Sequence, residues 1–324
     1  MRFDNDTPDP ASLFRTERDG NVMANAAVVR VRRVIRDGKL EAPPAELALT
    51  TLRQEPVDLG EYGELEPDAL CPRTGTDIIV VGDAVCPEPR IATRVEVHMG
   101  DYHVSLDVYG DRVWESVMGS LTPSDPQPFM RKPLTLLNAY GGAAEGEYGP
   151  IPWRYNPLGK GYYLKSTEAK DKPLPNVVFA GDKVAAWNDQ PVPASVGPYP
   201  NAWALRMEKI VSVDEATLGV SVDTEGGLAD RAHPVLSGKQ VEPGRMRILG
   251  MTERGVLELD VPPCPYEIDV TIGEKSATRS LSLEEIFIDL RSGVADFTYR
   301  KMFRYAFVPH QKRLTRLRTA SAPS

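Results

Sequence analysis

Residues 92–114, ATRVEVHMGDYHVSLDVYGDRVW, contain the clearest local pattern in the sequence. Apolar residues alternate with polar ones on both sides of Gly100-Asp101, with the period of two that is typical of a half-buried β-strand. The stretch therefore predicts a β-hairpin with a two-residue turn. That turn would pair apolar residues on one face: Met99 with Tyr102, Val97 with Val104, and Val95 with Leu106.

Strands of the same kind are predicted near both ends of the chain. Residues 25–36 are rich in Val and Arg, and the alternation of apolar and polar residues recurs over 266–272 and 286–290. There is no sustained helical period, and only short helices are predicted, around residues 44–53 and 203–209. The expected fold class is therefore mainly β, an antiparallel β-sandwich or two packed sheets.

The central region, residues 121–206, differs from the rest in composition. It holds thirteen of the 29 prolines and three of the four tryptophans. Proline at this density opposes long helices and central strands, whereas aromatic residues in this number are hard to leave in water. We expect long, ordered, Pro- and aromatic-rich loops laid over a β scaffold. Since no Gly/Ser-rich linker separates the two ends, residues 1–324 are predicted to form a single domain.

The chain of 324 residues has a formal net charge of -8, although Lys and Arg concentrate at two places. Binding to nucleic acid requires a clustered excess of positive charge, so the composition disfavours nucleic acid as a partner. We interpret residues 310–324 as a basic tail. The other concentration is interpreted as a solvated face of the first long strand and consists of Arg30, Arg32, Arg33 and Arg36.

The sequence predicts a protein that remains in the cytoplasm. Residues 1–14, MRFDNDTPDPASLF, lack the apolar core of a secretory signal, and no stretch of the sequence approaches the length of an apolar membrane span. Cys71, Cys86 and Cys264 are odd in number and widely spaced, which opposes a disulfide framework and fits a reducing compartment.

The best candidate for a metal site is the pair His98 and His103, which the predicted register places opposite each other, near Glu96 and Asp107. A Zn²⁺ site also needs a third ligand and supporting hydrogen bonds. Polar residues are expected on the solvated face of a hairpin in any case. The sequence therefore predicts no metal and no cofactor.

No catalytic residues are assigned, because the sequence contains no GxSxG elbow, no Walker loop and no Cys and His arrangement typical of a nucleophile. The 46 Asp and Glu residues leave open a carboxylate pair of the kind used by glycoside hydrolases. Aromatic side chains of the central region could line a sugar groove, cover the core or bind a protein partner. They include Tyr140, Trp153, Tyr155, Tyr162 and Tyr163.

Seven segments, in order along the chain, together resemble one bacterial domain family. They are TDIIVVGDA (76–84), YGDRVW (109–114), PSDPQPFMRKPL (123–134), AYGG (139–142), NPLGKGYY (156–163), LPN (174–176) and PASVGPYPNAWALR (193–206). The family they resemble, long of unknown function, is encoded beside PAAR-like spike-tip proteins and is implicated as a type VI secretion effector adaptor.

This resemblance implies a non-catalytic adaptor or chaperone rather than an enzyme. The implied partners are a PAAR-like protein or a toxin effector, which the adaptor would bind in the cytoplasm and help to load onto the VgrG spike. The aromatic side chains of the central region would then contribute to the partner-binding surface. Two alternatives stay open: a carbohydrate-active hydrolase that uses a carboxylate pair in the central loops, and a structural component of a phage-tail-like assembly.

Overall fold

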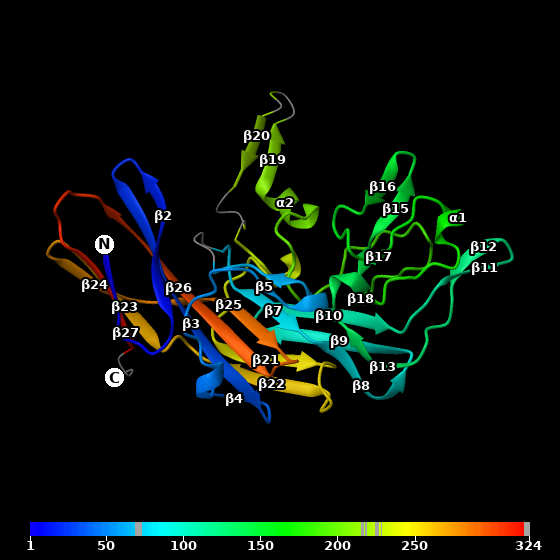
Figure 1. Cartoon of the computed structure of the whole chain (residues 1–324), viewed down its shortest axis with the longest axis horizontal. Coiled ribbons are helices and arrows are strands. Elements are labelled where there is room, and N and C mark those ends of the chain that lie inside the picture. Colours follow the sequence, from blue (N-terminus) through cyan, green and yellow to red (C-terminus); the bar gives the residue numbers. More distant parts are fainter. Residues whose placement is uncertain (69–72, 215–216, 218, 224–226, 228, 321–324) are drawn as a thin grey trace.

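The computed structural model describes residues 1–68, 73–214, 217, 219–223, 227 and 229–320, with only the backbone described for residues 16–19. Figure 1 shows several β-sheets and few, short helices. The predicted mainly β class is confirmed. Among the described residues, no helix combines the length and the apolar character that a membrane span requires.

The predicted hairpin consists of β9 (Ala92–Met99) and β10 (Tyr102–Tyr109). Its register is the predicted one, since Val97 lies opposite Val104 and His98 lies opposite His103. The apolar side chains are buried, whereas both histidines lie on the other face, because successive side chains of a strand point to opposite sides. The turn chemistry and the alternation were therefore sufficient to predict this element.

The hairpin lies at the centre of a five-stranded sheet in the order β18-β10-β9-β21-β22. Its other strands are β18 (Val177–Phe179), β21 (Gly244–Leu249) and β22 (Val256–Val261). All of these neighbours are antiparallel. The central position of β9 and β10 explains why their apolar face is buried along its length.

A six-stranded sheet joins the two ends of the sequence. Within it, β3 (Val22–Arg36) is antiparallel to β26 (Val294–Ala306) along the full length of β26. The sheet order is β2-β3-β26-β25-β7, where β2 is Ala11–Asp19, β25 is Ser282–Asp289 and β7 is Asp77–Val81, and β4 (Lys39–Glu41) also pairs with β3. β7 is parallel to β25, an exception to the predicted antiparallel arrangement. All five of its residues are buried, as is typical of parallel strands.

A four-stranded sheet has the order β1-β27-β23-β24. Its strands are β1 (Arg2–Asn5), β27 (Arg313–Thr319), β23 (Tyr266–Ile272) and β24 (Lys275–Ser280). The interpretation of residues 310–324 as a basic tail is thus wrong for 313–319, which pair with strands on both sides. Arg318 of β27 forms an ion pair with Asp269 of the neighbouring β23, so this arginine has an acidic partner across the sheet. Residues 321–324 lie outside the described residues.

Side chains of all three sheets form one hydrophobic core. It contains Phe297 of the six-stranded sheet, Leu106 of the five-stranded sheet and Leu317 of the four-stranded sheet, each at most 1% exposed. Strands from both ends of the sequence therefore share a core, as expected. That residues 1–324 fold as a single unit stays a prediction.

Part of the central region projects from this core as a lobe at the right of Figure 1, which contains α1 (Ser166–Ala169) and short strand pairs. These pairs are β11 (Trp114–Val117) with β12 (Ser120–Pro123), β15 (Ala143–Gly146) with β16 (Gly149–Pro152), and β14 (Tyr140–Gly141) with β17 (Lys160–Gly161). β13 (Phe129–Pro133) ties the lobe to β8 (Asp83–Arg90). Two small hydrophobic clusters, distinct from the main core, stabilise the lobe.

Two buried asparagines hold the loops of the lobe in place. The side-chain amide of Asn156 donates to the carbonyl oxygens of Leu136 and Tyr140, at 2.7 and 3.0 Å. The amide of Asn176 donates to the carbonyl oxygen of Tyr109 and to Asp111, both at 3.0 Å. These bonds satisfy backbone groups that proline-rich loops leave without a strand partner, which explains how such loops are ordered.

The remaining elements are short and lie outside the three main sheets. They are α2 (Ala204–Ile210), the hairpin of β19 (Val211–Asp214) and β20 (Gly219–Val222), β5 (Val57–Asp58), β6 (Glu64–Leu65), and the 3-10 helices Ala45–Leu47, Gly60–Tyr62, Leu136–Asn138 and Pro234–Leu236. The helix predicted at 203–209 is confirmed as α2. The helix predicted at 44–53 is reduced to one 3-10 turn, Ala45–Leu47, after which the backbone is extended at Ala48.

Candidate functional site

The aromatic residues of the central region gather around Trp153. Its ring lies 5.8 Å from that of Tyr140 and 5.3 Å from that of Tyr155, both edge to face, and 5.0 Å from that of Tyr162. Edge-to-face geometry is the favoured packing of aromatic rings. Of the aromatic residues singled out from the sequence, Tyr140, Trp153 and Tyr162 form a small core of the lobe, together with Ala144.

The five predicted partner-binding residues differ in their accessibility. Tyr140 is 1% exposed and Tyr162 is 8% exposed, so these two offer almost no surface to a partner. Trp153, Tyr155 and Tyr163 are partly exposed. Burial raises the pKa of Tyr163 to about 12, and its hydroxyl donates to the carbonyl oxygen of Pro173 at 2.9 Å. Tyr140 and Tyr162 therefore pack against the partly exposed Trp153, whereas Tyr163 packs against the other small cluster of the lobe.

Tyr155 links this cluster to α2. Its hydroxyl donates to the carboxylate of Glu208 at 3.1 Å, and its carbonyl oxygen accepts a hydrogen bond from the hydroxyl of Tyr199 at 2.6 Å. The guanidinium of Arg154 lies 4.6 Å from the centre of the Tyr155 ring and forms an ion pair with Glu208. The position of Tyr155 is consequently fixed before any partner binds.

The most exposed large apolar side chains of the lobe lie at hairpin tips. Tyr148 is 95% exposed between β15 and β16, and Met118 is fully exposed between β11 and β12, where its backbone has a φ of 49°. Ile151 and Leu158 are also about half exposed. Met118 was not among the residues predicted from the sequence to bind a partner. The two-residue turn Met118-Gly119 could have indicated this exposure, because side chains at a hairpin tip have few neighbours.

An apolar cavity of about 130 Å³ lies where the lobe meets the loop between β5 and β6. Leu137, Leu158, Tyr199 and Trp203 contribute to its walls. Its charged lining consists of Glu61, Glu64 and Glu66, together with Arg231, which is paired with Glu285. The cavity therefore combines an apolar interior with an acidic border.

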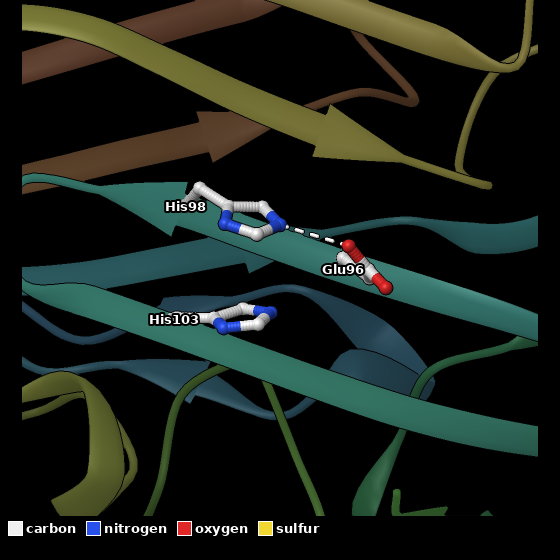
Figure 2. A group of neighbouring side chains, drawn as sticks. All are labelled: Glu96, His98 and His103. Carbon is white, nitrogen blue, oxygen red and sulfur yellow. Dashed lines mark hydrogen bonds and ion pairs between the residues drawn. The ribbon is translucent and has the colours of Figure 1, made fainter.

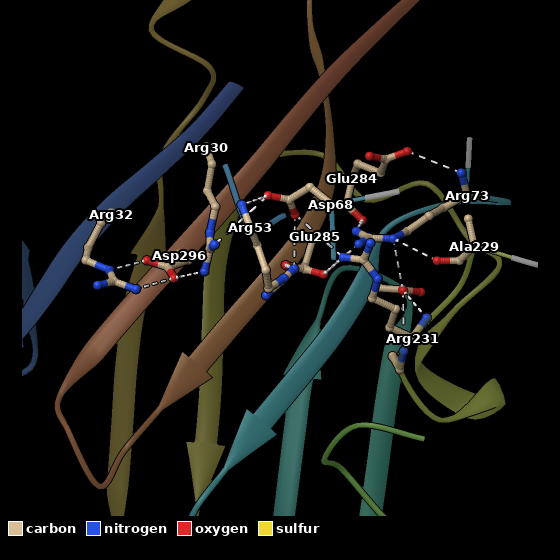
Figure 3. A network of polar contacts seen from close by, with 12 residues as sticks. Arg30, Arg32, Arg53, Asp68, Arg73, Ala229, Arg231, Glu284, Glu285 and Asp296 are labelled. Atoms are coloured by element: carbon tan, nitrogen blue, oxygen red, sulfur yellow. Dashed lines mark hydrogen bonds and ion pairs between the residues drawn. The ribbon is translucent and has the colours of Figure 1, made fainter. Parts of the chain in front are cut away.

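A network of buried ion pairs lies along strands β3, β26, β25 and β7 of the six-stranded sheet (Figure 3). At one end of it, Arg30 and Arg32 of β3 both donate to the carboxylate of Asp296 on β26, which is fully buried. The bonds from Arg32 measure 2.7 and 2.8 Å. The interpretation of these arginines as a solvated face is therefore wrong for Arg30, which is 6% exposed. Their acidic partner comes from a strand far away in the sequence.

Glu285 of β25 is the centre of the network. Its carboxylate accepts hydrogen bonds from Arg53 at 2.8 Å, from Arg73 at 2.6 Å and from Arg231 at 3.2 Å. Burial alone would raise the pKa of this carboxyl, but the three guanidinium groups outweigh it and hold the pKa well below the usual value. Asp68 adds a second carboxylate, which accepts a hydrogen bond from the guanidinium of Arg53 at 3.1 Å.

Asp77 of β7 lies next to this centre. Its carboxylate accepts a hydrogen bond from the backbone N–H of Arg231 at 2.6 Å and lies 3.3 Å from Nε of Arg73. Burial raises the pKa of Asp77 to about 7, against the opposing effect of Arg73. A buried group titrating near neutrality is a common feature of active sites, but structural ion-pair networks produce it as well.

The role of this ion-pair network is structural. Its residues are buried, and its arginines come from segments that are separated in the sequence, namely β3 and the loops around residues 53, 73 and 231. Burying charges is favourable only when they are paired and hydrogen-bonded, so the network fixes how these loops cover the sheet. It therefore explains why long irregular segments are ordered beside the lobe.

The polar face of the β9–β10 hairpin brings three potential metal ligands together (Figure 2). One ligand atom from each of Glu96, His98 and His103 lies within 4.8 Å of the other two. The imidazole rings are stacked, with centroids 4.1 Å apart. Asp107, which the sequence analysis placed nearby, instead forms an ion pair with Arg94 at 2.7 Å.

The cysteines carry no disulfide among the described residues, since Cys86 and Cys264 are free and Cys71 lies outside these residues. Burial raises the pKa of the Cys264 thiol to about 12, so it stays protonated near neutral pH. A protonated thiol is a poor nucleophile.

Comparison with known proteins identifies one match. The sequence model of the family DUF2169, described as an uncharacterized protein conserved in bacteria, matches residues 22–300. No curated protein and no solved structure matches the chain. The family match covers all seven of the segments on which the resemblance was based.

Proposed function

We propose that this chain, which belongs to the bacterial family DUF2169, is a non-catalytic binding protein whose central lobe holds a protein partner. The observation that carries the proposal is the exposure of large apolar side chains on one lobe. Met118, Tyr148 and Leu158 are each more than half exposed there. Contiguous exposed apolar surface marks interaction sites, so we propose that these side chains contribute to one binding surface.

The proposed surface combines two parts of the lobe. The partly exposed aromatic residues Trp153, Tyr155 and Tyr163 supply rigid contact area, which is typical of residues that dominate binding energy. Tyr148 extends this area at a hairpin tip. Because Trp153 and Tyr155 are already fixed by their neighbours, binding would cost little side-chain entropy.

The cavity beside the lobe indicates which chemical groups the partner presents. An apolar side chain fits its walls, which include Leu158 and Trp203, and basic residues next to that side chain would face the glutamates at its border. Such charge complementarity favours one orientation of the partner and accelerates its association. We therefore propose that the partner contributes an apolar anchor flanked by Lys or Arg.

The resemblance noted in the sequence supports a specific class of partner. We propose that the chain acts in the cytoplasm as an adaptor or chaperone for a PAAR-like protein or a toxin effector. Its role would be to help load that partner onto the VgrG spike of a type VI secretion system. Genes next to its own distinguish this proposal from the two alternatives, because a hydrolase belongs beside sugar-utilisation genes and a tail component beside phage-like genes.

The proposal is tested with purified protein and the PAAR-like protein encoded nearest to its gene. Wild-type chain should retain that protein in a pull-down, and the double variant Tyr148→Ala, Leu158→Ala should bind it more weakly. Truncating anchors of this kind costs about 2 kcal/mol, which corresponds to roughly a 30-fold higher Kd. Since both side chains are exposed, the melting temperature of the double variant should stay close to the wild-type value.

Val308→Ala is the matched control, because Val308 is 51% exposed and follows β26, outside the lobe. This variant should bind as the wild type does. Undiminished binding by the folded double variant would contradict the proposed surface. Absence of any binding by the wild-type chain would contradict the proposed partner.

A further inference from the structure

The polar face of the β9–β10 hairpin holds a compact group of metal-ligating side chains. The register of the two strands places His98 directly opposite His103, and Glu96 lies two residues before His98 on the same strand. Residues two apart in a strand point to the same side of the sheet, so all three side chains project together (Figure 2). The hairpin backbone itself therefore creates the group, without any contribution from a loop.

The distances in the group are close to those of a metal site. One ligand atom from each of the three side chains lies within 4.8 Å of the other two, and Nε2 of His98 lies 2.9 Å from a carboxylate oxygen of Glu96. Ligand atoms around a tetrahedral Zn²⁺ are roughly 3.3 Å apart, given bonds of about 2.0 to 2.1 Å. Small changes of side-chain rotamer suffice to close the difference, because these side chains are at most partly buried.

The charges around the group are already paired. Arg94 forms an ion pair with Asp107, and Arg247, which lies opposite His98 on β21, forms one with Glu258 at 3.1 Å. The carboxylate of Glu96 therefore faces the two imidazoles rather than a free guanidinium. Ser105 adds support, since its hydroxyl lies 3.2 Å from Nε2 of His103. Such an outer hydrogen bond helps to orient a histidine ligand.

We propose that Glu96, His98 and His103 bind one divalent transition-metal ion, of which Zn²⁺ is the expected occupant. Two imidazoles and a carboxylate are a ligand set that Zn²⁺ prefers, and three protein ligands leave a fourth position open. That position faces solvent, where a water molecule completes the coordination. This inference replaces the expectation of no metal, which rested on the lack of a third ligand and of supporting hydrogen bonds.

The test uses untagged full-length protein that has been stripped with a chelator and dialysed. Isothermal titration with Zn²⁺ should show one ion bound per chain, and Co²⁺ should give the visible absorption of a tetrahedral site. His98→Ala and His103→Ala should each weaken Zn²⁺ binding by at least tenfold, since loss of even an outer-shell partner costs about 10- to 100-fold. Binding to the wild type should also raise its melting temperature.

His310→Asn is the matched control, because His310 is exposed and its φ of 60° is a conformation that Asn tolerates. This variant should bind Zn²⁺ as the wild type does. The proposal is overturned if the wild type binds no Zn²⁺, or if binding survives both hairpin substitutions. Melting curves without metal confirm folding, and His103→Gln, at an exposed position, serves if an alanine variant does not fold.

Discussion

The backbone N–H of Arg231 donates a hydrogen bond of 2.6 Å to Oδ2 of Asp77, while Oδ1 of the same carboxyl is buried without a hydrogen-bond partner among the described residues. Oδ2 of this carboxyl therefore anchors a loop, whereas Oδ1 is buried without a compensating hydrogen bond. This imbalance explains why the pKa of Asp77 is raised to about 7. It also has a consequence for the stability of the protein as the pH changes.

We predict that Asp77 makes the protein less stable as the pH rises from about 4 to about 7. The folded-state pKa of about 7 lies above the ordinary value of 3.8, so the folded protein holds the proton more tightly than the unfolded chain does. The stabilising effect of that proton is complete below pH 4 and is lost as the pH passes 7. Asp77→Asn should remove this contribution.

The measurement is the difference in unfolding free energy between wild type and Asp77→Asn, from urea titrations at several pH values. The difference isolates Asp77, because buried His233, whose pKa is lowered to about 3, acts with the opposite slope in both proteins. The stability of the wild type relative to Asp77→Asn should fall as the pH rises. A difference that is constant with pH would show that the Asp77 carboxyl titrates normally.

Loss of the Glu285 carboxylate should be among the most destabilising single changes in the chain. Glu285→Gln would leave the guanidinium groups of Arg53, Arg73 and Arg231 buried with one carboxylate fewer. Breaking a buried ion pair from one side costs about 3 to 5 kcal/mol of unfolding free energy. Chemical denaturation should measure that loss.

Glu258→Gln provides the comparison for Glu285→Gln. Glu258 pairs with Arg245 and Arg247, but its side chain is 43% exposed. Exposed pairs contribute about 0 to 1 kcal/mol, so this variant should remain close to the wild type. Equal effects of the two substitutions would show that burial of the network does not determine its energetic importance.

The aromatic cluster and the hairpin tip should respond differently to alanine. Trp153→Ala removes a ring that packs against Tyr140 and Tyr162, and should lower the unfolding free energy by about 2 kcal/mol, less than for a fully buried tryptophan. Tyr148→Ala, at a position 95% exposed, should change it by less than about 0.5 kcal/mol. Thermal melts of the two variants make the comparison. If Trp153→Ala melts as the wild type does, the cluster is not a core.

Limited proteolysis tests the prediction that residues 1–324 form a single domain. Because β3 pairs with β26 along the whole of β26, a protease should trim the two ends first and leave a large core fragment. Electrophoresis and mass spectrometry of a digestion series identify the fragments. Early division into two fragments that separate and remain folded would demonstrate two domains.

The β9–β10 register could be predicted because it depends only on local information. The alternation of Val95 and Val97 with polar residues and the turn at Gly100-Asp101 specify both the faces and the pairing. The position of His98 opposite His103 follows from the same information. The local pattern could not predict the rotamer that brings Glu96 close to the two histidines, because this rotamer depends on the surrounding sheet.

The charged residues of β3 show where prediction from sequence fails. Arg30 has a local pattern typical of an exposed strand face, yet it is buried against Asp296. Its partner is 266 positions away, and only the β3–β26 register brings the two together. The parallel pairing of β7 with β25 is non-local in the same way. Long-range partners of this kind leave no signal in a single stretch of sequence.

The pairing of β3 with β26 also bears on how the protein is made. A ribosome synthesises Val22–Arg36 early, but Val294–Ala306 becomes available only after more than 250 further residues. Until then the apolar face of β3 lacks its long partner, and an unpaired apolar strand is prone to associate with other chains. Closing so large a loop is also slow. The nascent chain therefore has a long interval of exposure, during which a holding chaperone would protect it.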